Sequence, residues 1–458
     1  MTQDMTEGNP LKLIVRFSIP LLLGNLFQQT YNMFDAAIVG RYLGSDSLAA
    51  VGATTSVQFL VLGFCIGICT GFSIPVAQNF GARDFKSMRN FIFLGAILSA
   101  FFAAVLSISC SILSPQILNM LKTPSDIFGN AHGYILVIFL GIPFTILYNY
   151  LAGILRAVGD AKTPFVFLII SAGTNIALDL LFIIAFGWGC TGAAAATVLS
   201  QALSGILCLI TVLRRHEVLR LRREDAEWNV KKFGTLLGTG IPTGLQYSIT
   251  AIGSMVMQSS NNSLGSMYIS AFTAGSKLKQ FAMCPFDALA TGVSTFASQN
   301  YGAGKFGRIR KGLWTGVLIG SMYGLAAGLI LIFFGRNLSS LFVREGDGGV
   351  TDAAGRYVFF LGFFYWILGF LNTMRMTTQG LGHSGLAIFS GITEMAARCA
   401  VSFGLVPKFG FDAICICDQT AWISATLYIT PTCLLCIRKL AKDAGRKNSV
   451  KPDETPAD

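Results

Sequence analysis

The chain alternates between long apolar stretches and short polar segments. A segment of about 20 apolar residues, rising 1.5 Å per residue, crosses the ~30 Å hydrocarbon layer of a membrane. Runs of this kind lie near residues 13–37, 48–80, 90–112, 132–155, 164–186, 192–213, 234–258, 264–298, 312–334, 354–378, 385–406 and 413–437. The pattern therefore predicts an all-α polytopic membrane protein with twelve transmembrane helices.

Basic residues fall mainly in alternate connections, which predicts the orientation. If the amino terminus is inside, most of the 34 lysine and arginine residues lie in inner segments. Cytoplasmic loops carry such an excess, so both termini are expected in the cytoplasm and the chain in the plasma (inner) membrane. We expect an amino-terminal lobe over 1–213, a basic cytoplasmic linker over 214–233 near anionic lipid, a carboxyl-terminal lobe over 234–437 and a cytoplasmic tail over 438–458.

Composition excludes several classes of protein. Only 12% of the 458 residues are charged and 53% are hydrophobic, whereas soluble domains carry roughly 25% charged residues. This excludes a soluble enzyme and a nucleic-acid binder, despite the net charge of +11. The 11 cysteines nearly all lie in or beside apolar runs, where they behave as small hydrophobic residues. No cofactor and no bound metal is expected, apart from a coupling ion.

The two halves of the chain repeat each other. The segment 70–85 aligns with 291–306, with eight identical positions among sixteen. Ile19-Pro20 matches Ile241-Pro242 further towards the amino end of each half, and Gly159 matches Gly382. Six spans per half give two lobes of the same orientation, related by a pseudo-twofold axis along the membrane normal. This arrangement is typical of transporters that work by alternating access, and the alternative is a duplication that serves the fold alone.

Polar residues inside the spans of the first half are candidates for ion coupling, because charges in hydrocarbon are costly. Asp35 lies in the first span. Asn175 and Asp179 share one face of the fifth helix. A pair of buried carboxyl groups can take up a proton or Na⁺. The alternative for Asp35 is a cap on the outer end of its helix.

Further polar residues are candidates for lining a substrate cavity. In the first half these are Gln28, Asn32, Tyr148 and Asn149, and in the second half Lys277, Asp287 and Arg375. For Lys277 and Asp287 a balanced buried pair is the structural alternative. Glu394 and Arg398, spaced i and i+4, are expected to pair with each other.

With these residues in view, the chain resembles the MATE (multidrug and toxic compound extrusion) transporters over residues 8–437. The resemblance rests on five motifs, at Gln28-Gln29 with Asp35 and Val39-Gly40-Arg41, at 78–82, at 155–160, at Asn175 with Asp179, and at 299–304. It implies two six-helix lobes around a V-shaped cavity, exporting organic cations or related amphiphiles against inflow of H⁺ or Na⁺. It also implies coupling through Asp35, Asn175 and Asp179. A sodium-coupled branch of the family has its coupling acids in the second lobe. This chain has Thr250 and Leu368 at those positions, and neither can ionise, which favours coupling in the first lobe.

Other functions stay open as alternatives. A flippase of the same superfamily would move lipid-linked sugars and would need a strongly cationic cavity, whereas Asp287 opposes the cations here. A channel or an intramembrane enzyme would need a filter motif or a catalytic dyad, and neither is found. The expected partners are a small organic cation or amphiphile and membrane lipid, without nucleic acid, and the chain is expected to be a monomer.

Overall fold

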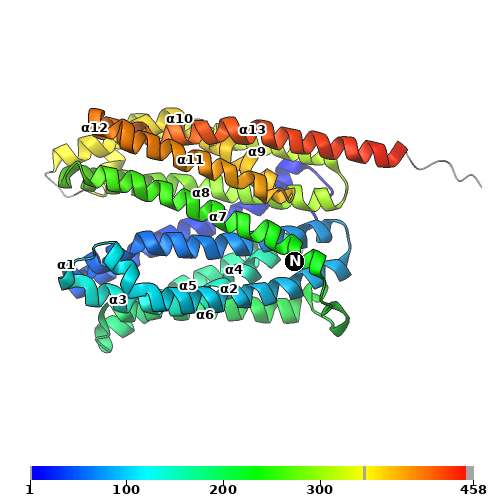
Figure 1. Ribbon diagram of the computed structural model, residues 1–458, viewed down its shortest axis with the longest axis horizontal. Coiled ribbons are helices and arrows are strands. Elements are labelled where there is room, and N and C mark those ends of the chain that lie inside the picture. Colours follow the sequence, from blue (N-terminus) through cyan, green and yellow to red (C-terminus); the bar gives the residue numbers. More distant parts are fainter. Residues whose placement is uncertain (1–2, 344–346, 450–458) are drawn as a thin grey trace, which may run out of the picture.

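The computed structural model describes residues 3–343 and 347–449, and in these ranges every regular element is helical (Figure 1). Helices α2–α6 lie in the lower half of the view and α7–α13 in the upper half. The prediction of an all-helical membrane protein with two lobes is confirmed. The acidic end of the predicted tail lies outside the described residues.

The helix bounds follow the apolar runs. The first lobe contains α1 (Pro10–Gly81), α2 (Phe85–Met120), α3 (Ser125–Leu140), α4 (Ile142–Ala157), α5 (Lys162–Leu180) with a π-helical extension (Leu181–Ala185), and α6 (Gly189–Arg215). Two short 3₁₀ turns, Glu217–Leu219 and Arg223–Asp225, lie in the linker. The second lobe contains α7 (Val230–Asn262), α8 (Ser266–Gly302), α9 (Phe306–Ser340), α10 (Gly348–Gly380), α11 (Ser384–Gly404), α12 (Val406–Phe409) and α13 (Phe411–Ser449).

The described helices supply the twelve predicted spans. Nine segments are long and apolar enough to cross a membrane, and α3 with α4 forms a tenth that bends by 44°. Helix α1 contributes two of the nine, because Gly44 breaks it with a left-handed backbone (φ 84°). The remaining two, α7 and α8, have 33 and 37 residues. They are long enough to span, at about 50 Å, but carry more polar residues.

The backbone repeats between the lobes. Residues with left-handed φ recur in four pairs whose numbers differ by 221 or 223. The pairs are Gly44 with Gly265, Arg83 with Gly304, Gly159 with Gly382, and Gly189 with Gly410. Each pair marks the same connection in its lobe, so these residues give the register of the repeat.

The lobes meet at a pair of equivalent glutamines. Gln78 Nε2 donates to the carbonyl oxygen of Gly380 at 3.0 Å, and Gln299 Nε2 donates to the carbonyl oxygen of Ala157 at 2.9 Å. In the repeat Gln78 is equivalent to Gln299 and Ala157 to Gly380, so the two hydrogen bonds are equivalent. We call this contact the seam. Its symmetry indicates a pseudo-twofold axis that passes between the two glutamines.

An amino-terminal strap, residues 3–9, covers the seam. Met5 is fully buried, and its N–H donates to Gln299 Oε1 at 2.8 Å. From the second lobe, Asn300 Nδ2 and Arg308 Nη2 donate to the Met5 carbonyl oxygen at 3.1 and 3.2 Å. From the first lobe, the Val158 carbonyl oxygen accepts the N–H of Gln3 at 3.0 Å. The strap therefore ties the two lobes together at this end.

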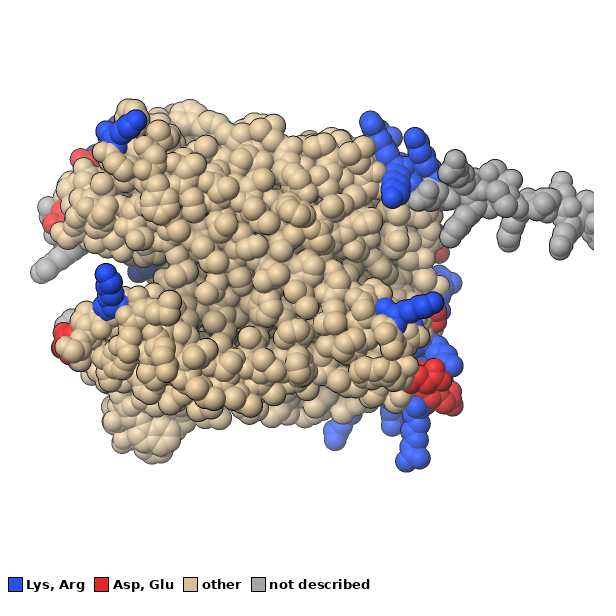
Figure 2. Space-filling view, in the orientation of Figure 1, with Lys and Arg blue, Asp and Glu red and all other residues tan. Residues whose placement is uncertain are grey.

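The two ends of the molecule differ in charge and in shape. Figure 2 shows lysine and arginine side chains gathered at the right end, where the linker lies and where α13 ends. The left end has few charges and is hollowed between the lobes (Figure 2). The hollow is thus open at the end opposite the basic residues, and the seam closes the basic end.

Candidate functional site

Asp35 and Asp179 lie close together inside the first lobe, on α1 and α5. Their carboxyl groups are near enough to interact electrostatically. Beyond this contact, no group within the described part of the chain donates a hydrogen bond to the buried Oδ1 of Asp35 or to either oxygen of Asp179. Among the described residues, no lysine, arginine or histidine forms an ion pair with either group. The first lobe therefore holds two neighbouring carboxyl groups without a compensating cation.

Asn175 lies one turn before Asp179 on α5 and is 2% exposed. Its Nδ2 lies 3.5 Å from Oγ1 of Thr197 on α6, and that hydroxyl donates to the Ala193 carbonyl oxygen at 3.1 Å. Because the hydroxyl proton is used in this way, Thr197 accepts from Asn175. This orientation leaves the buried Oδ1 of Asn175 without a donor.

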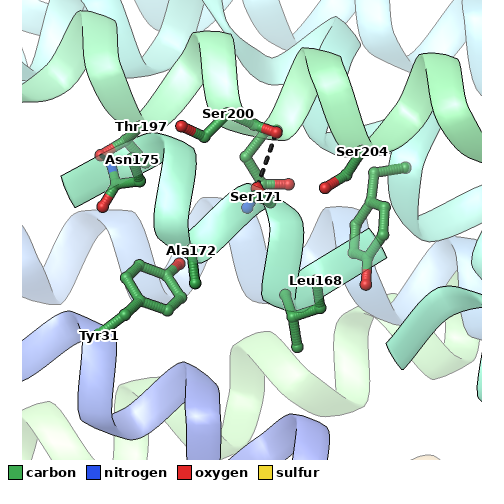
Figure 3. Close-up of a pocket in the computed structure, with 10 residues that line it drawn as sticks. Tyr31, Leu168, Ser171, Ala172, Asn175, Thr197, Ser200 and Ser204 are labelled. Carbon is green, nitrogen blue, oxygen red and sulfur yellow. Dashed lines mark hydrogen bonds between the residues drawn. The ribbon is translucent and has the colours of Figure 1, made fainter. Parts of the chain in front are cut away.

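A small polar cavity lies beside these residues, between α1, α4, α5 and α6 (Figure 3). It has room for about one water molecule. In Figure 3, Asn175 and Thr197 lie next to each other at one end and Tyr31 points towards the cavity from α1. The lining residues are Tyr31, Tyr148, Leu168, Ser171, Ala172, Asn175, Thr197, Ser200, Gln201 and Ser204. The predicted residue Tyr148 therefore shares this cavity with Asn175.

Three residues around the acids, Tyr134, Gln58 and Thr197, were not predicted from the sequence. Tyr134 on α3 interacts electrostatically with both Asp35 and Asp179 and contacts the side chain of Gln58. Thr197 holds Asn175 in place. A polar aromatic residue inside an apolar run was the only signal for Tyr134, and Thr197 lies in a run of alanines that gave none.

The other first-lobe candidates differ in their surroundings. The side chain of Gln28 contacts Tyr31, one turn further along α1. Asn32 is exposed. Asn149 is half-buried, and its Nδ2 donates to the Thr145 carbonyl oxygen on its own helix at 2.8 Å. Of these residues, Gln28 is connected to the carboxyl pair through Tyr31.

The second-lobe candidates separate into exposed and buried groups. Lys277 and Asp287 on α8 are both exposed, and Asn372 Nδ2 donates to Asp287 Oδ1 at 3.4 Å. Their exposure rules out the structural alternative of a buried pair. Arg375 on α10 is buried, and its Nη2 donates to Glu394 at 2.7 Å. The guanidinium group of Arg375 is therefore already paired with a carboxylate of the protein.

A chain of alternating charges runs through the interior of the second lobe. The predicted Glu394–Arg398 pair forms at 2.9 Å. Arg398 also contacts Asp418 at 3.1 Å, and Asp418 contacts Lys279 at 2.7 Å. With Arg375 at the other end, this second-lobe charge chain has three cations and two anions. Burial without such pairing would be costly.

The first-lobe cluster has the chemistry of a cation site. Carboxylate, amide and hydroxyl oxygens are the ligands that hard cations prefer. Asp35, Asp179, Asn175 and Thr197 supply all three kinds. The same carboxyl pair is also suited to bind a proton.

Comparisons with known proteins place the chain in a family. The MatE family model matches residues 20–181 and 242–401. The chain is 31% identical over 366 residues to a probable multidrug resistance protein, YpnP, of Bacillus subtilis, covering 80% of this chain and 81% of that one. It is 23% identical to the multidrug export protein MepA of Staphylococcus aureus, covering 84% and 86% of the two chains.

Solved structures share the fold. The chain superposes with a TM-score of 0.90 on an outward-facing multidrug resistance MATE family transporter of the MOP superfamily, at 22% identity and covering 96% of this chain and 99% of that one. A MATE in complex with MaL6 gives a TM-score of 0.89, also at 22% identity, covering 96% of this chain and 100% of that one. The chain belongs to the MatE family of multidrug efflux transporters, and it is therefore a multi-span membrane transporter of small molecules and not an enzyme.

Proposed function

We propose that this chain is a cation-coupled antiporter that exports organic cations or drug-like amphiphiles by alternating access. The observation that carries the proposal is the unpaired carboxyl pair Asp35 and Asp179 inside the first lobe. Two like charges repel strongly in a medium of low dielectric. A cation entering from the hollow end removes this repulsion, so cation binding and the arrangement of α1 against α5 are linked.

In the proposed cycle the cation and the substrate occupy the transporter in turn. With the hollow facing outward, the cation binds between the acids. The seam and the strap then separate, and the substrate enters from the cytosol or the inner leaflet as the cation leaves. Closing the seam again exposes the substrate to the outside. The cycle therefore alternates between two arrangements of the same two lobes, one open at the hollow end and one open at the basic end.

We propose Na⁺ as the coupling ion, with H⁺ as the alternative. A proton shared by Asp35 and Asp179 would satisfy the carboxyl groups but would leave Oδ1 of Asn175 without a partner. A bound Na⁺ would draw ligands from all three residues and from Thr197. Uptake into proteoliposomes driven by an imposed Na⁺ gradient, and separately by an imposed pH gradient, distinguishes the two ions.

The proposed substrate path follows the hollow between the lobes. Gln28, Asn32, Tyr148 and Asn149 would contact the substrate from the first lobe, and Lys277 and Asp287 would do so from the second. Asp287 would attract a cationic group. Arg375 would act indirectly, by holding Glu394 and α11 in place.

The proposed orientation follows the basic residues. Both termini, the linker 214–233 and the tail 438–458 would lie in the cytoplasm, with the lobes over 1–213 and 234–437. The chain would work as a monomer surrounded by lipid, in the plasma (inner) membrane. The gathering of lysine and arginine side chains at the seam end supports this orientation (Figure 2).

A flippase for lipid-linked pyrophosphates is less well supported. Such a substrate needs a cationic cavity, but Arg375 and Lys279 are buried or half-buried and neutralised by Glu394 and Asp418. Of the candidate cations this leaves Lys277, and the anionic Asp287 lies on the same helix, α8. Transport of a lipid-linked sugar and not of organic cations would overturn the proposal.

Efflux of ethidium from proteoliposomes tests the coupling assignment. Asp35→Asn and Asp179→Asn are each expected to reduce ion-driven efflux at least tenfold at equal protein content. In each variant one carboxyl group remains, so there is no repulsion between two carboxylates for a cation to relieve. Asp352→Asn, an exposed change on α10, serves as the control and should transport at the wild-type rate. Wild-type rates in both coupling variants would contradict the assignment.

A further inference from the structure

Three residues of the second-lobe charge chain, Lys279, Arg398 and Asp418, lie at positions equivalent to polar residues around Asp35 and Asp179 in the first lobe. The pairs of left-handed residues show that equivalent residues of the two lobes differ in number by 221 in the second and sixth spans. The difference is 223 in the fourth and fifth spans. This register pairs residues of the two clusters as follows: Gln58 with Lys279, Tyr134 with Tyr357, Asn175 with Arg398, and Thr197 with Asp418. The two clusters therefore occupy equivalent positions in the repeat.

The contacts are repeated as well as the positions. In the first lobe Tyr134 contacts Gln58. In the second lobe Lys279 Nζ lies 3.0 Å from the hydroxyl oxygen of Tyr357. The hydroxyl of Tyr357 in turn donates to Asp418 at 2.8 Å, so the tyrosine faces an acid in both lobes.

The contact between the fifth and sixth spans is also conserved by the repeat. Asn175 reaches Thr197 at 3.5 Å, and the equivalent Arg398 reaches Asp418 at 3.1 Å. All of these contacts join the same helices in each lobe. Chance resemblance of two buried polar clusters does not explain such a match.

The charges, in contrast, are reversed. The first-lobe cluster has two carboxyl groups and no cation of its own. In the second lobe, positions of neutral Gln58 and Asn175 are taken by lysine and arginine, and the buried residue at the position of Asp179 is Ser402. In the second lobe the positive charges thus belong to lysine and arginine side chains of the protein.

We propose that the second-lobe cluster is a duplicated cation site in which the side chains of Arg398 and Lys279 permanently take the place of the exchangeable ion. An arginine stays charged at any physiological pH, and it is covalently tethered, so it cannot leave. The transporter then exchanges its coupling cation at the first lobe alone. This inference rests on the proposed coupling role of Asp35 and Asp179.

Reversion of the tethered cations tests the proposal. Lys279→Gln with Arg398→Asn places the first-lobe residues at the equivalent positions and leaves Glu394 and Asp418 with Arg375 alone. These changes are made in full-length protein that also carries Asp179→Asn, which silences the first site. Purified protein is then assayed for binding of radioactive Na⁺ and for thermal unfolding, with choline replacing Na⁺ at constant ionic strength.

The expected results differ between the variants. Wild type should bind one Na⁺, and Asp179→Asn should bind none and unfold at a temperature independent of Na⁺. The triple variant should regain one Na⁺ and unfold several degrees higher when Na⁺ is present, as expected for a ligand that binds the native state. A matched control replaces two exposed cations, Arg336→Gln with Arg356→Asn, in the Asp179→Asn protein and should bind none.

Several results would overturn the proposal. One is a saturable Na⁺ site that survives Asp179→Asn in otherwise unchanged protein, and this measurement does not depend on whether the triple variant folds. Another is a folded triple variant that neither binds Na⁺ nor gains stability, relative to the Asp179→Asn parent, from Na⁺ or from mild acidification. If wild type binds no Na⁺ but the triple variant is stabilised by acid, the proposed coupling ion is wrong and the tethered-cation inference stands.

Discussion

At the scale of single residues, the connection between α4 and α5 holds a buried acid that depends on pH. Asp160 is 4% exposed, and Thr163 Oγ1 donates to its Oδ2 at 2.7 Å while His216 Nε2 lies 3.3 Å from the same oxygen. Burial alone would raise the pKa of this carboxyl, but the hydrogen bonds from His216 and Thr163 lower it from the ordinary 3.8 to about 2. Asp160 therefore favours the folded state as its ionised form.

The sign of the pH effect follows from this lowered pKa. The stabilisation by Asp160 is fully present above the ordinary value near 3.8 and is lost as the pH falls towards about 2. Its size is about 2 kcal/mol. Asp160→Asn should therefore lower the unfolding temperature at neutral pH, and the two unfolding curves should converge in strong acid. Thermal unfolding in detergent across this range measures the effect, and parallel curves would contradict it.

At the scale of helices, the second span of α1 packs directly on α7. A Cβ atom at Gly71 would lie 2.6 Å from Cα of Gly240, and one at Gly67 would lie 2.6 Å from Cα of Gly244. Small residues of this kind allow membrane helices to approach closely. The glycines therefore set how tightly the two lobes pack near the seam.

Gly71→Val should force α1 and α7 apart, because the atoms that a Cβ there would meet belong to the backbone of Thr239 and Gly240 and cannot yield. We expect at least a tenfold loss of transport and greater accessibility of the basic end to a water-soluble thiol reagent. Gly52→Val on the same span is the matched control, since nothing lies within 4 Å of a Cβ there. Equal behaviour of the two variants would show that the close approach is not needed.

At the scale of the whole molecule, the strap and the seam hold one end of the transporter closed. Arg308 donates to the carbonyl oxygens of Met5 and Gly8, at 3.2 and 2.9 Å. Losing these bonds removes stabilisation from the state in which the basic end is closed. Arg308→Ala should therefore shift the population towards the state open at that end.

Distances between spin labels across the two ends measure this shift. In Arg308→Ala the label pair at the hollow end should move closer and the pair at the basic end should separate. Arg310→Ala, an exposed arginine on the same helix, should keep the wild-type distribution. An unchanged distribution in Arg308→Ala would show that the strap does not bias the lobes.

Features that depend on local composition could be predicted from the sequence. Apolar runs longer than the hydrocarbon thickness can only be buried in lipid as helices, so the spans were predictable, and the repeat predicted two lobes. The duplicated motifs at 78–82 and 299–304 were recognisable because their glycines and glutamines recur in the same order. Asp35 and Asp179 were candidates because a carboxyl group inside a span is costly.

Which side chains meet could not be predicted in this way, because it depends on how the helices pack. Tyr134 and Thr197 carry no charge and lie in ordinary apolar runs, so they became part of the site only when α3 and α6 packed beside the acids. Likewise, Asp418 and Lys279 are 139 positions apart, and folding brings them within 2.7 Å of each other. The sequence pattern predicts whether each segment lies in lipid or in water. The partner of a buried charge, in contrast, depends on how helices from distant parts of the chain pack together.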